Sequence, residues 1–248
     1  MRFLDTLKIP VVATLRDSQA YIRAAETGLG IFEMNPAQVE EDLAALEGAL
    51  LAEFGLSDVR GEVPYSGRTD RAIVRDLLHL HDLDQGPDNW RRLMDAYLAR
   101  LPECLSRHSG RVLPGIAELL ETLSQHDGTV VGLLTGNVRE GARLKLSHYG
   151  LYHHFALGGF GDRHFDRDDV AREALAAVHE HLNGAAGRHE IWVIGDTPLD
   201  IACARAIGAR VAAVATGWHD LAELEAAKPD LLFADLSDGS RLLRELGL

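Results

Sequence analysis

Short apolar runs recur along the second half of the chain and are separated by stretches with helical spacing. The runs are Thr129–Leu134, Glu190–Ile194, Arg210–Ala215 and Asp230–Phe233. The helical stretches between them are Val138–Tyr149, Asp168–Leu182 and Leu199–Ile207. Continuous apolar strands that alternate with helices are typical of a parallel sheet covered on both faces. The pattern therefore predicts an α/β fold with a Rossmann-like parallel sheet flanked by helices.

The pattern changes in residues 37–108, where apolar residues recur at helical spacing and no strand pattern is present. These apolar positions are Leu43, Leu46, Leu50, Leu51, Ile73, Val74, Leu77, Leu78, Leu93, Tyr97 and Leu101. A Pro-Gly turn at Val112–Gly115 and a helix from Ile116 then return the chain to the sheet. We expect three parts: residues 1–36, supplying the first strand and helix of the core; a helical cap, 37–108; and an α/β core, 109–248.

Composition narrows the classes of function. The chain has 248 residues and a formal net charge of -13, and an acidic surface disfavours nucleic acid as a partner. No signal peptide and no apolar run long enough to span a membrane are found, so a cytoplasmic location is expected. Cys104 and Cys203 match no metal-ligand spacing, and the histidine pairs His79/His81 and His153/His154 lack a third ligand in sequence. Neither set predicts a metal site, and nothing in the sequence indicates the oligomeric state.

Polar residues follow three of the apolar runs, at Thr135–Asn137, Asp196–Asp200 and Thr216. In an open α/β sheet, ligands bind at the carboxyl ends of the strands. A hydroxyl and backbone N–H groups at a helix start suit phosphate oxygens, and two carboxylates at a turn suit Mg²⁺. Each segment taken alone is also typical of a helix cap. Their joint occurrence at strand ends favours a phosphate and Mg²⁺ site.

These segments resemble the motifs of haloacid dehalogenase (HAD) superfamily hydrolases. Leu133–Asn137 is similar to the second motif and Gly195–Asp200 to the fourth, with Arg167 as the best match to the basic residue of the third. Ser66–Asp70 resembles the cap segment of phosphoglycolate-phosphatase-like members. The resemblance covers roughly residues 46–248, with the motifs in the order of the family.

The resemblance implies a role for each matched residue. Thr135, Arg167 and Asp196 would be catalytic, and Asp196 would bind Mg²⁺ with Asp200 in support. The phosphoryl group would be held by Thr135, Gly136, Asn137 and Arg167. Arg68 and Asp70 would close over a small phosphorylated metabolite. For Arg167 the alternative is a solvated surface charge, and for Arg68 and Asp70 it is capping of a helix.

The first HAD motif, a strand ending in Asp-x-Asp-Gly-Thr, does not occur in the sequence. Its first Asp is the nucleophile that attacks phosphorus, and its second is the general acid and base. Three segments could occupy its place: Ile9–Leu15, Leu29–Glu33 followed by Asn35, and Phe3–Leu7. The first puts Pro10 and Val12 at the two carboxylate positions, the second puts Glu33 and Asn35 there, and the third has no strand before Asp5. Ile9–Leu15 is the better strand by propensity and is favoured, whereas Leu29–Phe32 is better placed relative to the cap. Asp17 or Glu33 could supply a substitute carboxylate.

Residues 3–44 resemble the C-terminal part of ParA-type partition ATPases, on the strings Phe3–Pro10, Thr14–Glu26 and Gly28–Phe32. No Gly-x-x-x-x-Gly-Lys-Ser/Thr string is present, so the resemblance does not imply ATPase activity. We hypothesise a fusion in which a partition-protein tail replaced the first strand of a phosphatase.

Two functions follow from the sequence. The first is Mg²⁺-dependent hydrolysis of a small phosphomonoester, with the missing motif putting activity in question. The second is a non-catalytic HAD-fold protein that binds a phosphorylated ligand. A partition-system interaction module is a third reading, disfavoured because residues 3–44 are too few to fold alone.

Overall fold

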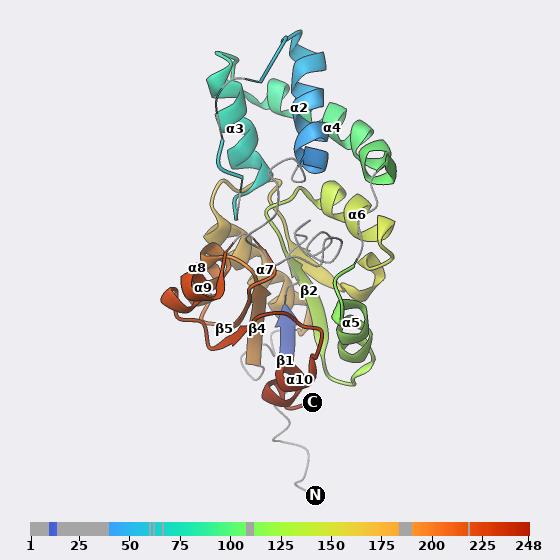
Figure 1. Cartoon of the computed structure of the whole chain (residues 1–248), viewed down its shortest axis with the longest axis vertical. Helices are drawn as coiled ribbons and strands as arrows, with labels where there is room; N and C mark the ends of the chain where they lie inside the picture. The colour runs from blue at the N-terminus through green and yellow to red at the C-terminus, as the bar shows by residue number, and fades with distance from the viewer. Residues whose placement is uncertain are drawn as a thin grey trace, which may run out of the picture.

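The computed structural model describes residues 10–13, 40–59, 61, 63–65, 67–107, 112–183, 190–217 and 219–248. The strands are β1 (Pro10–Ala13), β2 (Val130–Leu134), β3 (Leu157–Gly159), β4 (Glu190–Gly195), β5 (Arg210–Val214) and β6 (Leu231–Phe233). They form one parallel sheet with the order β3-β2-β1-β4-β5-β6 (Figure 1). Five of these strands, all except β3, thus lie in runs that the sequence predicted, and the α/β class with a Rossmann-like sheet is confirmed.

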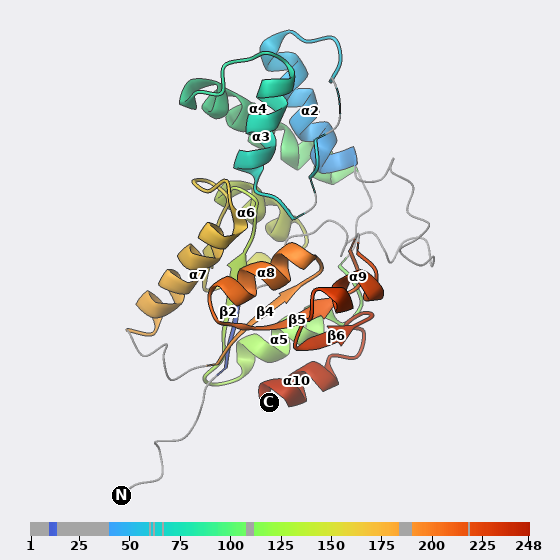
Figure 2. The same ribbon diagram turned by 90° about the vertical axis from the view of Figure 1, so that its left-hand side faces the viewer.

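Helices cover both faces of this sheet (Figure 2). The helices are α2 (Glu40–Phe54), α3 (Asp70–Leu80), α4 (Pro87–Arg107), α5 (Ile116–Gln125), α6 (Arg139–His148), α7 (Arg167–His181), α8 (Pro198–Ala206), α9 (Leu221–Ala226) and α10 (Ser240–Leu246), with a 3₁₀ turn η3 (Tyr152–His154). Helices α5 and α10 share one apolar cluster with the sheet. Helices α7, α8 and α9 share another.

Strand β4 shows why the sequences of these strands are unbroken runs of apolar residues. Trp192 and Ile194 belong to the cluster with α5 and α10, whereas Val193, between them, belongs to the cluster with α7 and α8. Successive side chains of a strand point to opposite faces. Both faces are covered here, so both sets of side chains must be apolar.

Strand β1 occupies the centre of the sheet, between β2 and β4. Val11 pairs with Val130 on one side and with Ile191 on the other. The strand lies inside the run Ile9–Leu15, for which the sequence favoured this position. Pro10 is tolerated because it is the first residue of the strand. Three predicted features lie outside the described residues. They are the first helix of the core, the alternative segment Leu29–Glu33, and most of residues 3–44, which resemble the partition ATPases.

Helices α2, α3 and α4 form a helical lobe that stands beyond the sheet, at the top of Figures 1 and 2. The lobe has its own apolar core, which α3 lines with Ile73, Val74, Leu77 and Leu78. Val138, which precedes α6, joins this core and connects the lobe to the sheet. The predicted bounds of the cap, 37–108, stay a prediction, since residues 37–39 and 108 lie outside the described part.

The sequence did not predict strand β3, which has three residues, two of them glycine. A Cβ atom at Gly159 would collide with the Val170 carbonyl oxygen, so the glycine lets α7 lie directly on the strand. Packing against α7 therefore defines this strand more than β propensity does. In the described part of the chain, no helix has the length and apolarity needed to cross a membrane.

Candidate phosphate and Mg²⁺ site

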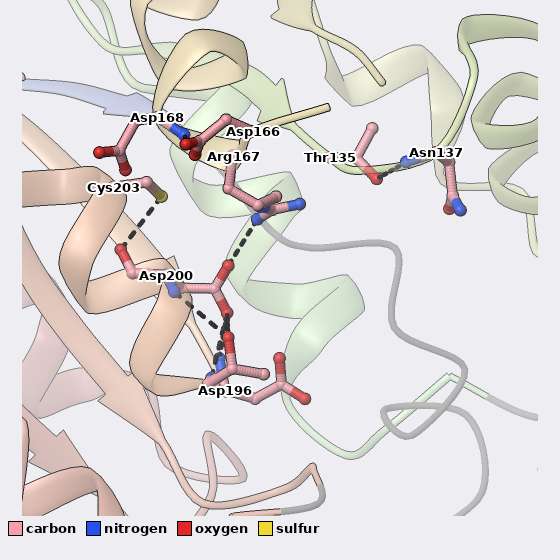
Figure 3. Close-up of polar contacts among 9 residues, drawn as sticks. Thr135, Asn137, Asp166, Arg167, Asp168, Asp196, Asp200 and Cys203 are labelled. Carbon is pink, nitrogen blue, oxygen red and sulfur yellow. Dashed lines mark hydrogen bonds and ion pairs between the residues drawn. The ribbon is translucent and has the colours of Figure 1, made fainter. Parts of the chain in front are cut away.

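The carboxyl ends of the two strands beside β1 carry the central polar residues. Thr135 follows β2 and Asp196 follows β4, and both side chains are buried. Because β2 and β4 are parallel and flank β1, their carboxyl ends meet at the same edge of the sheet. Figure 3 shows these two residues together with Arg167, which reaches in from the start of α7.

The Thr135 hydroxyl is oriented by its own loop. The Asn137 backbone N–H donates to Thr135 Oγ1 at 3.1 Å, and the Thr135 backbone N–H donates to the Gly159 carbonyl at 3.1 Å. Gly136 lies against the Arg68 carbonyl oxygen, where a Cβ atom would collide. A hydroxyl is both a donor and an acceptor. With its oxygen accepting from Asn137, the Thr135 O–H remains able to donate to a ligand oxygen.

Arg167 is a buried cation that forms an ion pair with Asp200. Its side chain is 5% exposed, and Nη2 donates to Asp200 Oδ1 at 2.5 Å. Its Nε and Nη1 atoms are buried and have no hydrogen-bond partner among the described residues. An unsatisfied donor of this kind costs about 1–3 kcal/mol, and more for a charged group. The alternative of a solvated surface charge is therefore wrong for Arg167.

Both carboxylate oxygens of Asp200 are engaged. Oδ1 accepts from Arg167, while Oδ2 accepts from the backbone N–H groups of Asp196 (3.2 Å) and Thr197 (3.0 Å) and from the Thr197 hydroxyl (2.8 Å). The Thr197 hydroxyl accepts in turn from the Asp200 backbone N–H, which completes a capping box at the start of α8. Asp200 therefore positions Arg167 and the loop that carries Asp196. Its support of a metal ion stays a prediction.

Asp196 is fully buried at the end of β4. Its carboxylate lies against Gly217, where a Cβ atom would collide with Oδ2. The neighbouring Thr216 hydroxyl is buried and has no partner among the described residues. Gly217 is a residue whose role the sequence did not reveal, because its need for glycine depends on a carboxylate 21 positions away in the sequence.

The structure places Arg68 and Asp70 at the junction of the helical lobe and the sheet. Arg68 donates to the Pro64 carbonyl (3.0 Å) and forms an ion pair with Asp76 (2.6 Å), within the lobe. Asp70 accepts from Asn137 Nδ2 (3.1 Å) and from the Val138 backbone N–H (2.8 Å). Asp70 thus ties α3 to the Thr135 loop (both residues' contact with a substrate stays a prediction).

Lys145 extends this junction and was not among the predicted site residues. It is 1% exposed on α6, and its Nζ donates to Asn137 Oδ1 at 3.2 Å. The Asn137 amide therefore bridges the carboxylate of Asp70 and the ammonium of Lys145. A charged group at each end fixes the orientation of the Asn137 amide. No motif or spacing in the sequence marks this lysine, because its partner Asn137 reaches it only in the folded chain.

The described residues of β1 carry no carboxylate. They are Pro10, Val11, Val12 and Ala13. The residues considered as a substitute nucleophile or acid, namely Asp5, Asp17, Glu33 and Asn35, lie outside the described residues. The described structure therefore contains the predicted phosphate-binding and Mg²⁺-binding residues without the nucleophile of the missing motif.

Cys203 lies in α8 next to this site, and its thiol has a raised pKa. Burial, together with the nearby Asp200 carboxylate, raises the pKa of the Cys203 thiol to about 12. The thiol donates to the Asp200 carbonyl at 3.2 Å. A thiol with this pKa is protonated at neutral pH and is a poor nucleophile. Cys203 is therefore a packed residue of α8.

Comparison with known proteins agrees with this fold. The chain belongs to the family of haloacid dehalogenase-like hydrolases, whose model matches residues 48–205. It is 27% identical over 214 residues to a phosphoglycolate phosphatase of Synechococcus elongatus, covering 84% of this chain and 93% of that protein. It is 26% identical over 215 residues to a phosphoglycolate phosphatase of Mannheimia succiniciproducens, covering 79% of this chain and 88% of that protein.

Solved structures show the same fold. CbbY from Rhodobacter sphaeroides, determined in complex with phosphate, superposes with a TM-score of 0.63 at 14% identity. The match covers 94% of this chain and 97% of that one. At this identity the likeness concerns the fold alone.

Proposed function

We propose that this chain binds a small phosphomonoester together with Mg²⁺, in a site of the HAD phosphatase type, and that the site is built for phosphomonoester hydrolysis. The relatives named above are phosphoglycolate phosphatases, so 2-phosphoglycolate is the first ligand to test. Thr135 and Arg167 would contact the phosphoryl group, with the backbone of Gly136 and Asn137 beside it.

The observation that supports this proposal most directly is the unpaired half of Arg167. A buried guanidinium that keeps Nε and Nη1 without partners among the described residues has the geometry of an anion receptor. Asp200 holds Nη2 and so fixes the plane of the group. A phosphoryl group carries several acceptor oxygens and would satisfy the remaining donors.

The residues present also fit Mg²⁺. Asp196 offers a buried carboxylate, and Gly217 leaves space beside it that any larger residue would fill. Oxygen ligands of this type are those that Mg²⁺ takes. Arg167, Asp196 and Asp200 together supply one cation and two anions, so a phosphate dianion would meet net negative charge. A divalent cation held by Asp196, with Asp200 in support, would reverse that sign and neutralise charge on the phosphoryl group.

Hydrolysis by the family's route also requires a carboxylate that attacks phosphorus. Thr135 would orient the phosphoryl group by donating from its hydroxyl, and Arg167 would stabilise the charge that develops on the phosphoryl oxygens. Neither side chain can form an acyl phosphate. In this chain the attacking carboxylate would have to come from outside the described residues, where Asp17 and Glu33 are the candidates in sequence.

A second function, ligand binding without hydrolysis, is supported by β1 itself. This strand holds the central position between Thr135 and Asp196, and its described residues are all apolar. A chain with this strand and no substitute carboxylate would retain phosphate and Mg²⁺ binding while losing the covalent step.

The helical lobe would act as the cap over this site. Asp70 and the Thr69 hydroxyl bridge α3 to the sheet lobe, through Val138 and the Phe165 carbonyl (3.3 Å). These bonds hold the lobe close to the carboxyl ends of the strands, where a lid would exclude water from a bound ligand.

The test is Mg²⁺-dependent hydrolysis of an aryl phosphate and of 2-phosphoglycolate by the purified chain, beside an Asp196→Asn variant. Turnover that disappears in Asp196→Asn and without Mg²⁺ would assign the phosphatase function. Phosphate binding without turnover, in protein shown to be folded, would assign the second function. Absence of both binding and turnover would reject both.

If turnover is observed, Asp17→Asn and Glu33→Gln would locate the nucleophile, with Asp166→Asn as a matched control. Asp166 is the exposed N-cap of α7 and accepts from the Asp168 backbone N–H. The nucleophile variant should abolish turnover, whereas the control should retain it.

A further inference from the structure

Two adjacent histidines and a glutamate come together on the surface of the sheet lobe. His153 and His154 end η3, and Glu121 lies in α5. One ligand atom from each of the three residues lies within 4.8 Å of the others. We propose that Glu121, His153 and His154 form a site for a transition-metal ion of the Zn²⁺ class, independent of the phosphate site and of the proposed function.

The ligand set has the composition of known Zn²⁺ sites. Two imidazoles and one carboxylate, with a position left for water, form a set that binds Zn²⁺. Donors around one tetrahedral Zn²⁺ lie about 3.3 Å apart, given metal–ligand distances of about 2.0–2.2 Å. The ligand atoms of Glu121, His153 and His154 lie at most 4.8 Å apart, so small side-chain rotations would bring them to the spacing of about 3.3 Å. Glu121 and His153 are exposed at the surface.

Neighbouring residues already orient two of the three ligands. The Ser124 hydroxyl is 3.2 Å from His154 Nδ1, and the Gln125 side chain donates to Glu121 Oε1. Metal-bound histidines commonly have their second ring nitrogen held by such a partner. The ring centroids of His153 and His154 lie 3.9 Å apart, so both rings occupy the same side of η3.

Two of the three proposed ligands are imidazoles, which decides the class of metal ion that the site would take. Imidazole nitrogen selects Zn²⁺ and similar ions over Mg²⁺, which prefers oxygen ligands.

The position of this site indicates a structural or regulatory role. Helix α5 precedes β2, and η3 precedes β3, so the three ligands lie toward the amino ends of these strands. The phosphate site lies at the opposite, carboxyl ends. A metal ion here would join α5 to η3 across more than 30 residues of chain without touching a phosphorylated ligand.

The experiment is a Zn²⁺ titration of the full chain against a chromogenic chelator, with millimolar Mg²⁺ present to occupy the Asp196 site. Variants His153→Gln and Glu121→Gln remove ligands, and Ser124→Ala removes the residue that orients His154. His179→Gln, on the exposed part of α7, is the matched control. Urea unfolding without metal checks that each variant folds.

We expect one bound Zn²⁺ in the wild-type chain, weakened more than about 100-fold in the ligand variants and about 10-fold in Ser124→Ala. His179→Gln and Asp196→Asn should bind as the wild type does. Equal binding in His153→Gln, or no binding in the wild-type chain, would overturn the proposal. Loss of the ion in Asp196→Asn alone would assign it to the phosphate site and would also overturn it.

Discussion

Replacing Asp200 by alanine should destabilise this chain far more than an ordinary helix cap would. The variant breaks the ion pair with Arg167 and leaves that cation buried at 5% exposure without its counterion. Breaking a buried pair by removing one partner costs about 3–5 kcal/mol. Losing the capping interactions at the start of α8 adds about 1 kcal/mol.

The expected loss is therefore about 4–6 kcal/mol, a large share of the about 5–15 kcal/mol that stabilises a typical domain. The chain offers a matched control in its second capping box, at the start of α9. There Glu223 accepts from the Asp220 backbone N–H and Asp220 accepts from that of Glu223, on the surface. Glu223→Ala removes the same kind of cap without a buried ion pair and should cost about 1 kcal/mol.

Urea unfolding followed by circular dichroism measures both variants against the wild type. The double variant Arg167→Met/Asp200→Ala provides a second check, because removing the orphaned cation should recover part of the loss. Equal losses in Asp200→Ala and Glu223→Ala would refute the reasoning, as would a double variant less stable than Asp200→Ala alone.

Three further predictions follow from the same contacts. Asp70→Ala should speed hydrogen exchange at the start of α6 and lower the free energy of unfolding by about 1–3 kcal/mol, because it removes the acceptor of the partly buried bond from the Val138 N–H. Unchanged exchange there would contradict this. A thiol reagent at pH 8 should label Cys104 and leave Cys203 unmodified until the chain unfolds, because the pKa of Cys203 is about 12; native labelling of Cys203 would contradict its burial. The pKa of His154 is lowered in the folded chain, so protonation of His154 favours the unfolded chain. The free energy of unfolding should therefore be higher above about pH 6.5 and should fall as the pH drops below that value. Without added metal, His154→Gln should make the free energy of unfolding less dependent on pH, and an unchanged pH profile would contradict the lowered pKa.

The sequence predicted the parts of the fold in which a local pattern coincides with burial. Strands β2, β4, β5 and β6 are apolar runs buried on both faces, and α3 and α4 bury the apolar positions that their helical spacing marks. Strand β3 was missed because two of its three residues are glycines, whose absence of side chains serves the packing of α7.

The sequence predicted those site residues that belong to short motifs of neighbouring residues. Thr135 and Asp196 follow strands, so their place at the sheet edge could be inferred. The contacts that define Asp70, Lys145 and Gly217 join residues far apart in sequence, and no spacing rule reveals them. The same reason concealed the approach of Glu121 to the two histidines of η3.

In the proposed function, Arg167 binds a phosphoryl group beside a cation held by Asp196. Isothermal titration of 2-phosphoglycolate with and without Mg²⁺, into the wild-type chain and into Arg167→Met, tests it directly. We predict Mg²⁺-dependent binding by the wild-type chain, weakened about 10- to 150-fold in the variant, the equivalent of a charged hydrogen bond of about 1.5–3 kcal/mol. Binding of equal strength in Arg167→Met, or binding that is indifferent to Mg²⁺, would contradict the account.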